Sequence, residues 1–144
     1  MDVKDILEQW KEDSKIDRLE LQEGSLRTQE LHSKYIDIYF YERARLLQLK
    51  DRYNKMKRLR HEYWLGLLSQ EELKEHGWAP QPQRIAKQDI DLYLDSDEVL
   101  SKISLQFALQ QEKLNVIDSI IKTIGQRGFH INSAIVWNKF VAGQ

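Results

Sequence analysis

The sequence predicts an all-α protein of two long antiparallel helices, with a short helix at each end of the chain, that assembles into an oligomer. Both prolines, Pro80 and Pro82, fall in one short segment. The rest of the 144 residues therefore lack the residue that breaks helices most strongly. Helix-forming Leu, Glu, Lys, Arg and Gln dominate on either side of that segment. Apolar residues recur there in alternating steps of four and three, a spacing typical of helices that pack on other helices.

Length and composition narrow the class of protein. A chain of 144 residues favours one domain, expected here as residues 1–144. Cysteine is absent, which excludes a disulfide framework and a cysteine-based zinc site. No apolar run approaches the roughly 20 residues of a membrane span, and the charged first residues do not resemble a secretory signal. We therefore expect an intracellular protein without membrane association.

Residues 1–16 are expected to form an amphipathic arm, and residues 19–68 a long helix. In the arm, Ile6, Leu7 and Trp10 lie at helical spacing and should pack on the long helix or on a neighbouring subunit. The long helix would run ~75 Å at 1.5 Å per residue. A protomer of this size cannot cover that length, so we expect oligomerisation. The seam of the long helix comprises Tyr35, Tyr39, Glu42, Leu46, Leu49, Tyr53, Met56, Arg60, Tyr63 and Leu67.

Residues 69–94 are expected to form a connecting loop, because acidic residues, a glycine and the two prolines interrupt the helical pattern. Apolar and other residues alternate from Ile90 to Leu94, a two-residue period that favours a short extended stretch.

A second long helix is expected over residues 95–126, followed by an assembly helix within 129–144. Asp95 as the N-cap and Glu98 three residues later form a capping box at its start. Gly125 and Gly128 are expected to end it, because glycine takes the left-handed conformation of helix C-caps without strain. The apolar residues after Phe129 need burial in an assembly. The seam of this helix comprises Ile103, Phe107, Gln110, Leu114, Ile117, Ile121 and Ile124.

A basic stretch on the first long helix carries the functional signal. From Arg43 to Arg60 there are eight Lys and Arg residues and one acid, although the whole chain has a net charge of -1. Such a concentration of positive charge commonly binds phosphate groups. Tyr63 and Trp64 close the stretch, and unpaired bases stack on such rings for ~1–3 kcal/mol per base. The candidate single-strand contacts are Arg43, Lys50, Arg52, Lys55, Lys57, Arg58, Arg60 and Trp64.

The sequence leaves two other roles of the basic stretch open. Lysine and arginine away from a helix seam usually form a solvated face. The acidic residues of the first arm could also pair with the stretch across a subunit interface. Tyr63 itself falls on the seam, which favours its burial.

No catalytic constellation is visible in the sequence. The four histidines are scattered and form no metal-binding pattern, and no glycine-rich phosphate loop occurs. We therefore expect neither an enzyme nor a bound metal or cofactor.

Four groups of residues make the chain resemble the UvsY recombination mediators of T-even-type phages. Each motif is short, but together they span most of the chain in the family's order. They are Ile16-Asp17 with Leu21-Gln22; Ser33-Lys34 before Tyr35; Tyr63-Trp64-Leu65-Gly66 after the basic stretch; and Ser104-Leu105-Gln106-Phe107 with Arg127-Gly128-Phe129, Ile131 and Ala142-Gly143.

The resemblance implies a recombination mediator that acts in phage recombination, repair and replication, in the cytoplasm of the infected host. Its implied partners are single-stranded DNA, a RecA-like recombinase, single-strand-binding protein and further copies of itself, in a ring-like hexamer or heptamer. Arg58 and Arg60 match a pair of basic residues that the family uses for DNA binding. Residues 69–94 do not follow the family pattern.

Arg60 receives two conflicting assignments, since the seam buries it and the resemblance places it on DNA. Either a seam that opens near its end or a register that differs from the one drawn here by Tyr63 would reconcile them. The alternative function is a structural coiled-coil phage assembly protein without a DNA role, in which the basic stretch serves protein contacts.

Overall fold

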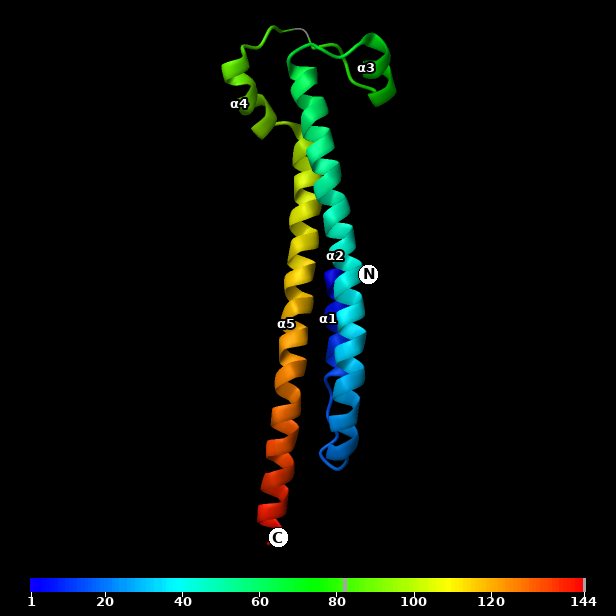
Figure 1. The fold of residues 1–144 in the computed structure, drawn as a ribbon, viewed down its shortest axis with the longest axis vertical. Helices are drawn as coiled ribbons and strands as arrows, with labels where there is room; N and C mark the ends of the chain where they lie inside the picture. Colours follow the sequence, from blue (N-terminus) through cyan, green and yellow to red (C-terminus); the bar gives the residue numbers. More distant parts are fainter. Residues whose placement is uncertain (82, 144) are drawn as a thin grey trace. The chain divides into compact units, whose positions relative to one another are not determined.

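The prediction of an all-α protein is confirmed by a computed structural model, which describes residues 1–81 and 83–143 and has no strand among them. Its elements are α1 (Val3–Asp13), α2 (Leu21–Trp64), α3 (Gln70–His76), the 3-10 helix η1 (Lys87–Asp89), α4 (Ile90–Asp95) and α5 (Glu98–Val141) (Figure 1). Pro82 lies outside the described residues. The chain forms two compact units: the first unit, Met1–Ala44 with Gln110–Gln144, and the second unit, Arg45–Leu109. No helix in the described part of the chain is long and apolar enough to span a bilayer.

The core of the first unit joins α1, the beginning of α2 and the second half of α5. Trp10 of α1 packs edge-on against Tyr35 of α2, with ring centroids 5.4 Å apart and the rings at 86°. Edge-to-face packing is favoured because the positive ring edge meets the negative ring face. The arm therefore packs on the long helix of its own chain. The buried cluster comprises Ile6, Leu31, Tyr35, Ile117, Ile120 and Ile124.

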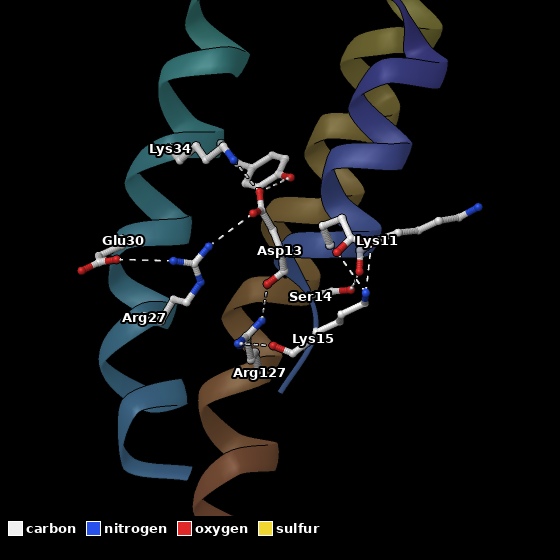
Figure 2. Close-up of polar contacts among 10 residues, drawn as sticks. Lys11, Asp13, Ser14, Lys15, Arg27, Glu30, Lys34 and Arg127 are labelled. Atoms are coloured by element: carbon white, nitrogen blue, oxygen red, sulfur yellow. Dashed lines mark hydrogen bonds and ion pairs between the residues drawn. The ribbon is translucent and has the colours of Figure 1, made fainter. Parts of the chain in front are cut away.

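Asp13, the last residue of α1, ties this helix to both of its neighbours (Figure 2). Its carboxylate accepts hydrogen bonds from Arg27 at 3.3 Å, from the Lys34 ammonium and from the Tyr35 hydroxyl at 3.0 Å, all on α2. Arg127 of α5 donates to the backbone carbonyl of Asp13 at 3.1 Å. The side chain thus anchors α1 to α2, and the backbone anchors it to α5.

The surroundings of Asp13 fix the charge of its carboxylate. Burial alone would raise the pKa of Asp13, but hydrogen bonds from Lys34 and Tyr35 and the charges of Lys34 and Arg27 together lower it below the ordinary value. Burial, and then the hydrogen bond to Asp13, raise the pKa of Tyr35 above its usual range. At neutral pH the pair therefore consists of a charged acceptor and a protonated donor.

Two polar seam residues, Glu42 on α2 and Gln110 on α5, form hydrogen bonds with each other inside the first unit. The Gln110 amide donates to the Glu42 carboxylate at 2.7 Å and to its backbone carbonyl at 2.8 Å. Lys113 donates to the same carboxylate at 3.3 Å and to the carbonyl of Met1 at 2.7 Å. Buried polar groups are tolerated when they are paired in this way.

The prediction that Gly125 and Gly128 end the second long helix is wrong, because α5 continues through both to Val141. Neither glycine has a positive φ. Ile124 and Ile131 are each 1% exposed, so the buried face continues at seven-residue spacing across the glycines. A glycine inside a helix costs about 1 kcal/mol relative to alanine. Burial of a single isoleucine contributes about 1.5–3 kcal/mol and offsets that cost.

Residues 69–94, predicted as a loop, contain α3, η1 and α4. Ser69 caps α3 through its hydroxyl, which accepts the backbone N–H of Glu72 at 3.2 Å. Gly77 ends α3 with φ 70°, the left-handed C-cap conformation that glycine adopts most readily. The backbone N–H of Trp78 closes the cap by donating to the Leu73 carbonyl at 2.9 Å. The position of Trp78 is therefore set by the end of α3.

The expected extended stretch at Ile90 to Leu94 is also wrong, because these residues form α4. Ile90 and Leu94 are buried, four residues apart, while Leu92 between them is 70% exposed. One buried face at a spacing of four is a helical pattern, and the sequence alternation did not reveal which apolar residues are buried. Ile90, Leu94 and Leu100 form the core of the second unit, with Tyr53 and Met56 of α2 packed against it.

Candidate nucleic-acid interface

Most of the predicted DNA-binding residues lie in the second unit and are exposed to solvent. The face of α2 that carries Tyr53 and Met56 packs on the core, so residues on its other faces are exposed. Arg43, in the first unit, is exposed too. The exposed candidates in the second unit are Lys50, Arg52, Lys55, Lys57 and Arg58.

Neighbouring acids pair with two of these cations without burying them. Lys55 lies 2.8 Å from Asp51, and Arg58 lies 3.5 Å from Glu62, each one helical turn away. The hydrogen bond and the charge of Asp51 raise the pKa of Lys55, which keeps it protonated. Exposed pairs at this spacing contribute little, because solvent and salt screen their charges. An arriving phosphate can therefore displace these acids at small cost.

Lys57 lies beside a cavity of about 410 Å³ in the second unit. Tyr53, Asp95 and Ser101 also line this cavity. Lys57 is exposed, so its ammonium can reach solvent from the cavity wall.

Arg60 occupies the seam position that the sequence predicted, and its side chain is only 9% exposed. Its Nε donates to Asp97 Oδ2 at 2.7 Å. The indole N–H of Trp64 donates to the same oxygen at 2.8 Å. Asp97 Oδ1 accepts the backbone N–H of Leu100 at 3.0 Å and so caps α5. Arg60 and Trp64 therefore face Asp97, whereas the five exposed cations face solvent.

The predicted N-cap of the second long helix, Asp95, is exposed, and α5 begins later, at Glu98. Asp97 takes the capping role instead, because one of its oxygens reaches the helix backbone while the other meets Arg60 and Trp64. From the sequence alone, Asp97 is expected only to add favourable charge near the start of the helix. The charged seam position Arg60 was a signal that an acid partner had to exist.

Aromatic rings surround the Arg60 guanidinium. The ring centroids of Tyr63, Trp78 and Trp64 lie 4.2, 4.6 and 5.5 Å from its Cζ, distances typical of cation–π contacts. The Tyr63 hydroxyl donates to the Ala79 carbonyl at 2.8 Å and holds the segment after α3 against α2. His76 stacks on Trp78 at 4.5 Å. Trp78 is not among the site residues predicted from the sequence, because it lies in the segment predicted as a loop.

These side chains line a cavity of about 430 Å³. Tyr93 of α4 contributes to its wall and lies 5.1 Å from Trp64, with the rings at 43°. Arg60 and Asp97 supply the charged part of the lining, and Trp64 and Trp78 the aromatic part. Among the residues that the structure describes, no group of His, Cys, Asp and Glu could hold a metal ion.

The fold is similar to crystal structures of the recombination mediator protein UvsY of bacteriophage T4. In lattice type IV the TM-score is 0.85 at 21% identity, covering 97% of this chain and 99% of that chain. In lattice type II it is 0.85 at 21% identity, covering 99% and 98%. In lattice type I it is 0.82 at 20% identity, covering 94% and 98%.

Sequence comparison with curated proteins gives no significant match. A family model described as "Recombination, repair and ssDNA binding protein UvsY" matches residues 9–144. This match extends over nearly the whole chain, and it confirms the resemblance drawn from the short motifs. The chain belongs to the UvsY family.

Proposed function

We propose that this protein is a recombination mediator that binds single-stranded DNA through the exposed cations of α2. The observation that carries the proposal is the exposure of Lys50, Arg52, Lys55, Lys57 and Arg58 on one helix of a chain whose family is described as single-strand DNA binding. Arg43 extends the same stretch. Flexible, solvated cations meet phosphates without loss of a buried contact, and they neutralise the backbone whatever its sequence.

Arg60 and Trp64 have a different role in this proposal. The Arg60 Nε–H and the Trp64 indole N–H both donate to Asp97, so these two residues shape the end of α2 and do not track the DNA backbone. The family resemblance matches Arg58 and Arg60 to a pair of DNA-binding residues. Of these two, Arg58 contacts phosphate, because its side chain is 85% exposed.

Replacing Lys50, Arg52 and Arg58 together by alanine should weaken binding to a fluorescent single-stranded oligonucleotide. Each phosphate contact in single-stranded DNA contributes about 0.7 to the slope of log K against log salt concentration, so the slope should flatten by about 2. At about 0.1 M salt this corresponds to a loss of affinity on the order of 100-fold. Fluorescence anisotropy across a salt series measures both quantities.

The matched control replaces Lys4, Lys11 and Lys122, which are exposed lysines of the first unit, by alanine. This variant undergoes the same change in net charge, so it should keep the slope of the wild type. Equal slopes for the two triple variants would rule out the α2 cations as the DNA-binding surface.

The mediator step follows from the same contacts. Once bound, the protein would hold the strand in a form that loosens single-strand-binding protein and lets a RecA-like recombinase form its filament. The triple variant of Lys50, Arg52 and Arg58 should therefore also fail to restore recombinase ATPase activity on DNA coated with single-strand-binding protein. A variant that binds DNA poorly yet restores this activity fully would contradict the step.

We further propose that the two long helices form an antiparallel pair in each subunit and that subunits assemble into a ring-like hexamer or heptamer. The support is the exposed apolar end of α5, where Phe129, Val136, Trp137, Phe140 and Val141 are 63–72% exposed. Contiguous exposed apolar residues of this size commonly mark interfaces. A ring would multiply modest single-site contacts by raising the effective concentration of second sites.

Native mass spectrometry tests the ring. The expected result is a single closed species of six or seven subunits that binds one oligonucleotide. Substituting serine for Trp137 and Phe140 should shift it toward smaller species, because the apolar contact area is lost. A wild-type protein that stays monomeric at micromolar concentration would contradict the ring.

A further inference from the structure

The aromatic cavity of the second unit contains unused hydrogen-bond donors. In the described residues the only hydrogen-bond partner of the Arg60 side chain is Asp97, which takes the Nε–H. The two terminal nitrogens of the guanidinium carry further N–H donors. Arg60 lines the cavity although its side chain is 91% buried. A buried side chain with free donors beside an open cavity is poised for a ligand that offers acceptors.

The cavity also offers aromatic surface on more than one side. Trp78 arrives from the end of α3, Tyr93 from α4, and Tyr63 and Trp64 from α2. Its volume of about 430 Å³ falls within the range of pockets that hold small planar ligands. Walls of this kind select a flat, polarisable ring.

We propose that this cavity binds one unpaired nucleobase of the single strand, with the base edge accepting hydrogen bonds from the Arg60 terminal nitrogens and the base ring packing against Trp78 and Tyr93. The proposal rests on the single-strand binding proposed above and adds a base contact to it. In a duplex each base is stacked and paired, so only a single strand can insert a base.

Charge and chemistry favour a nucleobase over other flat ligands. Lys57 is exposed and lies three residues before Arg60, on the same side of α2, so a phosphate held by Lys57 lies about one helical turn from Arg60 in the cavity wall. Keto oxygens and ring nitrogens of bases accept hydrogen bonds from arginine. Single-stranded bases are commonly recognised by stacking on aromatic rings together with such edge contacts.

The segment that carries Trp78 is held in place by two contacts from separate elements. The left-handed Gly77 closes α3, and the Tyr63 hydroxyl binds the Ala79 carbonyl at 2.8 Å. Arg60 lies on Trp78 from the α2 side, with 4.6 Å from Cζ to the ring centroid. The wall of the cavity is thus assembled before any ligand arrives, which lowers the ordering cost of binding.

The experiment compares an oligo(dT) with an oligonucleotide of the same length in which every base is an abasic site. Both carry the same phosphate charge, so their affinity ratio isolates the contribution of the bases. The wild type should bind oligo(dT) about 5- to 150-fold more tightly, the range expected for one stacked base. Trp78→Leu and Tyr93→Leu should each bring this ratio toward one without weakening the binding of the abasic strand.

Three controls make the result specific. Trp78→Phe retains an aromatic wall and should retain most of the ratio. Leu92→Ala changes an exposed residue of α4 outside the cavity and should leave the ratio unchanged. Replacing Lys50, Arg52 and Arg58 by alanine should weaken both oligonucleotides equally.

Equal affinity of the wild type for the two oligonucleotides would overturn the base site while leaving single-strand binding intact. A ratio that persists in both Trp78→Leu and Tyr93→Leu would also overturn it, because the bases would then be read elsewhere. If the wild type binds neither oligonucleotide, the proposed function itself fails.

Discussion

Replacing Asp97 by alanine is expected to lower the free energy of unfolding by about 3–5 kcal/mol, the usual cost of removing one partner of a buried ion pair. Asp97 is fully buried and serves three groups: the Arg60 guanidinium, the Trp64 indole and the backbone N–H that begins α5. Alanine leaves a buried cation without its partner and removes a helix cap. Urea unfolding followed by circular dichroism measures the loss.

Asp95→Ala is the matched control, because it removes the same charge from an exposed position two residues away. Its effect should stay within about 0.5 kcal/mol. Arg60→Ala in the wild type and in Asp97→Ala completes a double-mutant cycle, in which the second loss should be much smaller than the first. Equal effects for the two aspartates would show that the buried pair does not stabilise the second unit.

Replacing Asp13 by asparagine should destabilise the protein by about 2–3 kcal/mol at neutral pH, since charged hydrogen bonds to Lys34, Tyr35 and Arg27 are weakened. The effect should depend on pH. Folding lowers the pKa of Asp13, so the carboxylate stabilises the fold fully above its unfolded-state pKa of about 3.9. That contribution is lost as the pH falls through the lower folded-state pKa.

The difference between the wild type and Asp13→Asn should therefore be constant near neutral pH and shrink below about pH 4. Unfolding curves at a series of pH values test this dependence. Glu12→Gln is the control, because Glu12 pairs only with Lys15 in the described residues and both side chains are at least 70% exposed. A difference for Asp13→Asn that does not change down to acid unfolding would contradict the role assigned to its charge.

Periodicity predicted the buried faces of the long helices well. Even the two charged positions on the first seam, Glu42 and Arg60, are 2% and 8% exposed. The spacing of residues along a helix fixes which of them share a face, whatever their chemistry. Leu67 is the exception, at 68% exposed, because α2 ends before it at Trp64.

Helix ends and tertiary partners were not predictable from local patterns. Glycine predicted an end at residues 125–128, but the burial of Ile131 in the first unit keeps α5 helical there. Asp95 and Asp97 have similar local settings, and only the buried Arg60 selects Asp97 as the cap. Trp78 reaches the candidate site through the turn after α3, which depends on contacts that no period in the sequence encodes.

The polar contacts within the two units also imply an order of folding. Arg60 and Asp97 are 37 residues apart in the chain, Glu42 and Gln110 are 68 apart, Met1 and Lys113 are 112 apart, and Asp13 and Arg127 are 114 apart. The entropic cost of closing a loop rises with its length, so contacts between near neighbours form first. Among these four contacts, we therefore expect the one between Arg60 and Asp97 to form first and those that join α1 to α5 to form last.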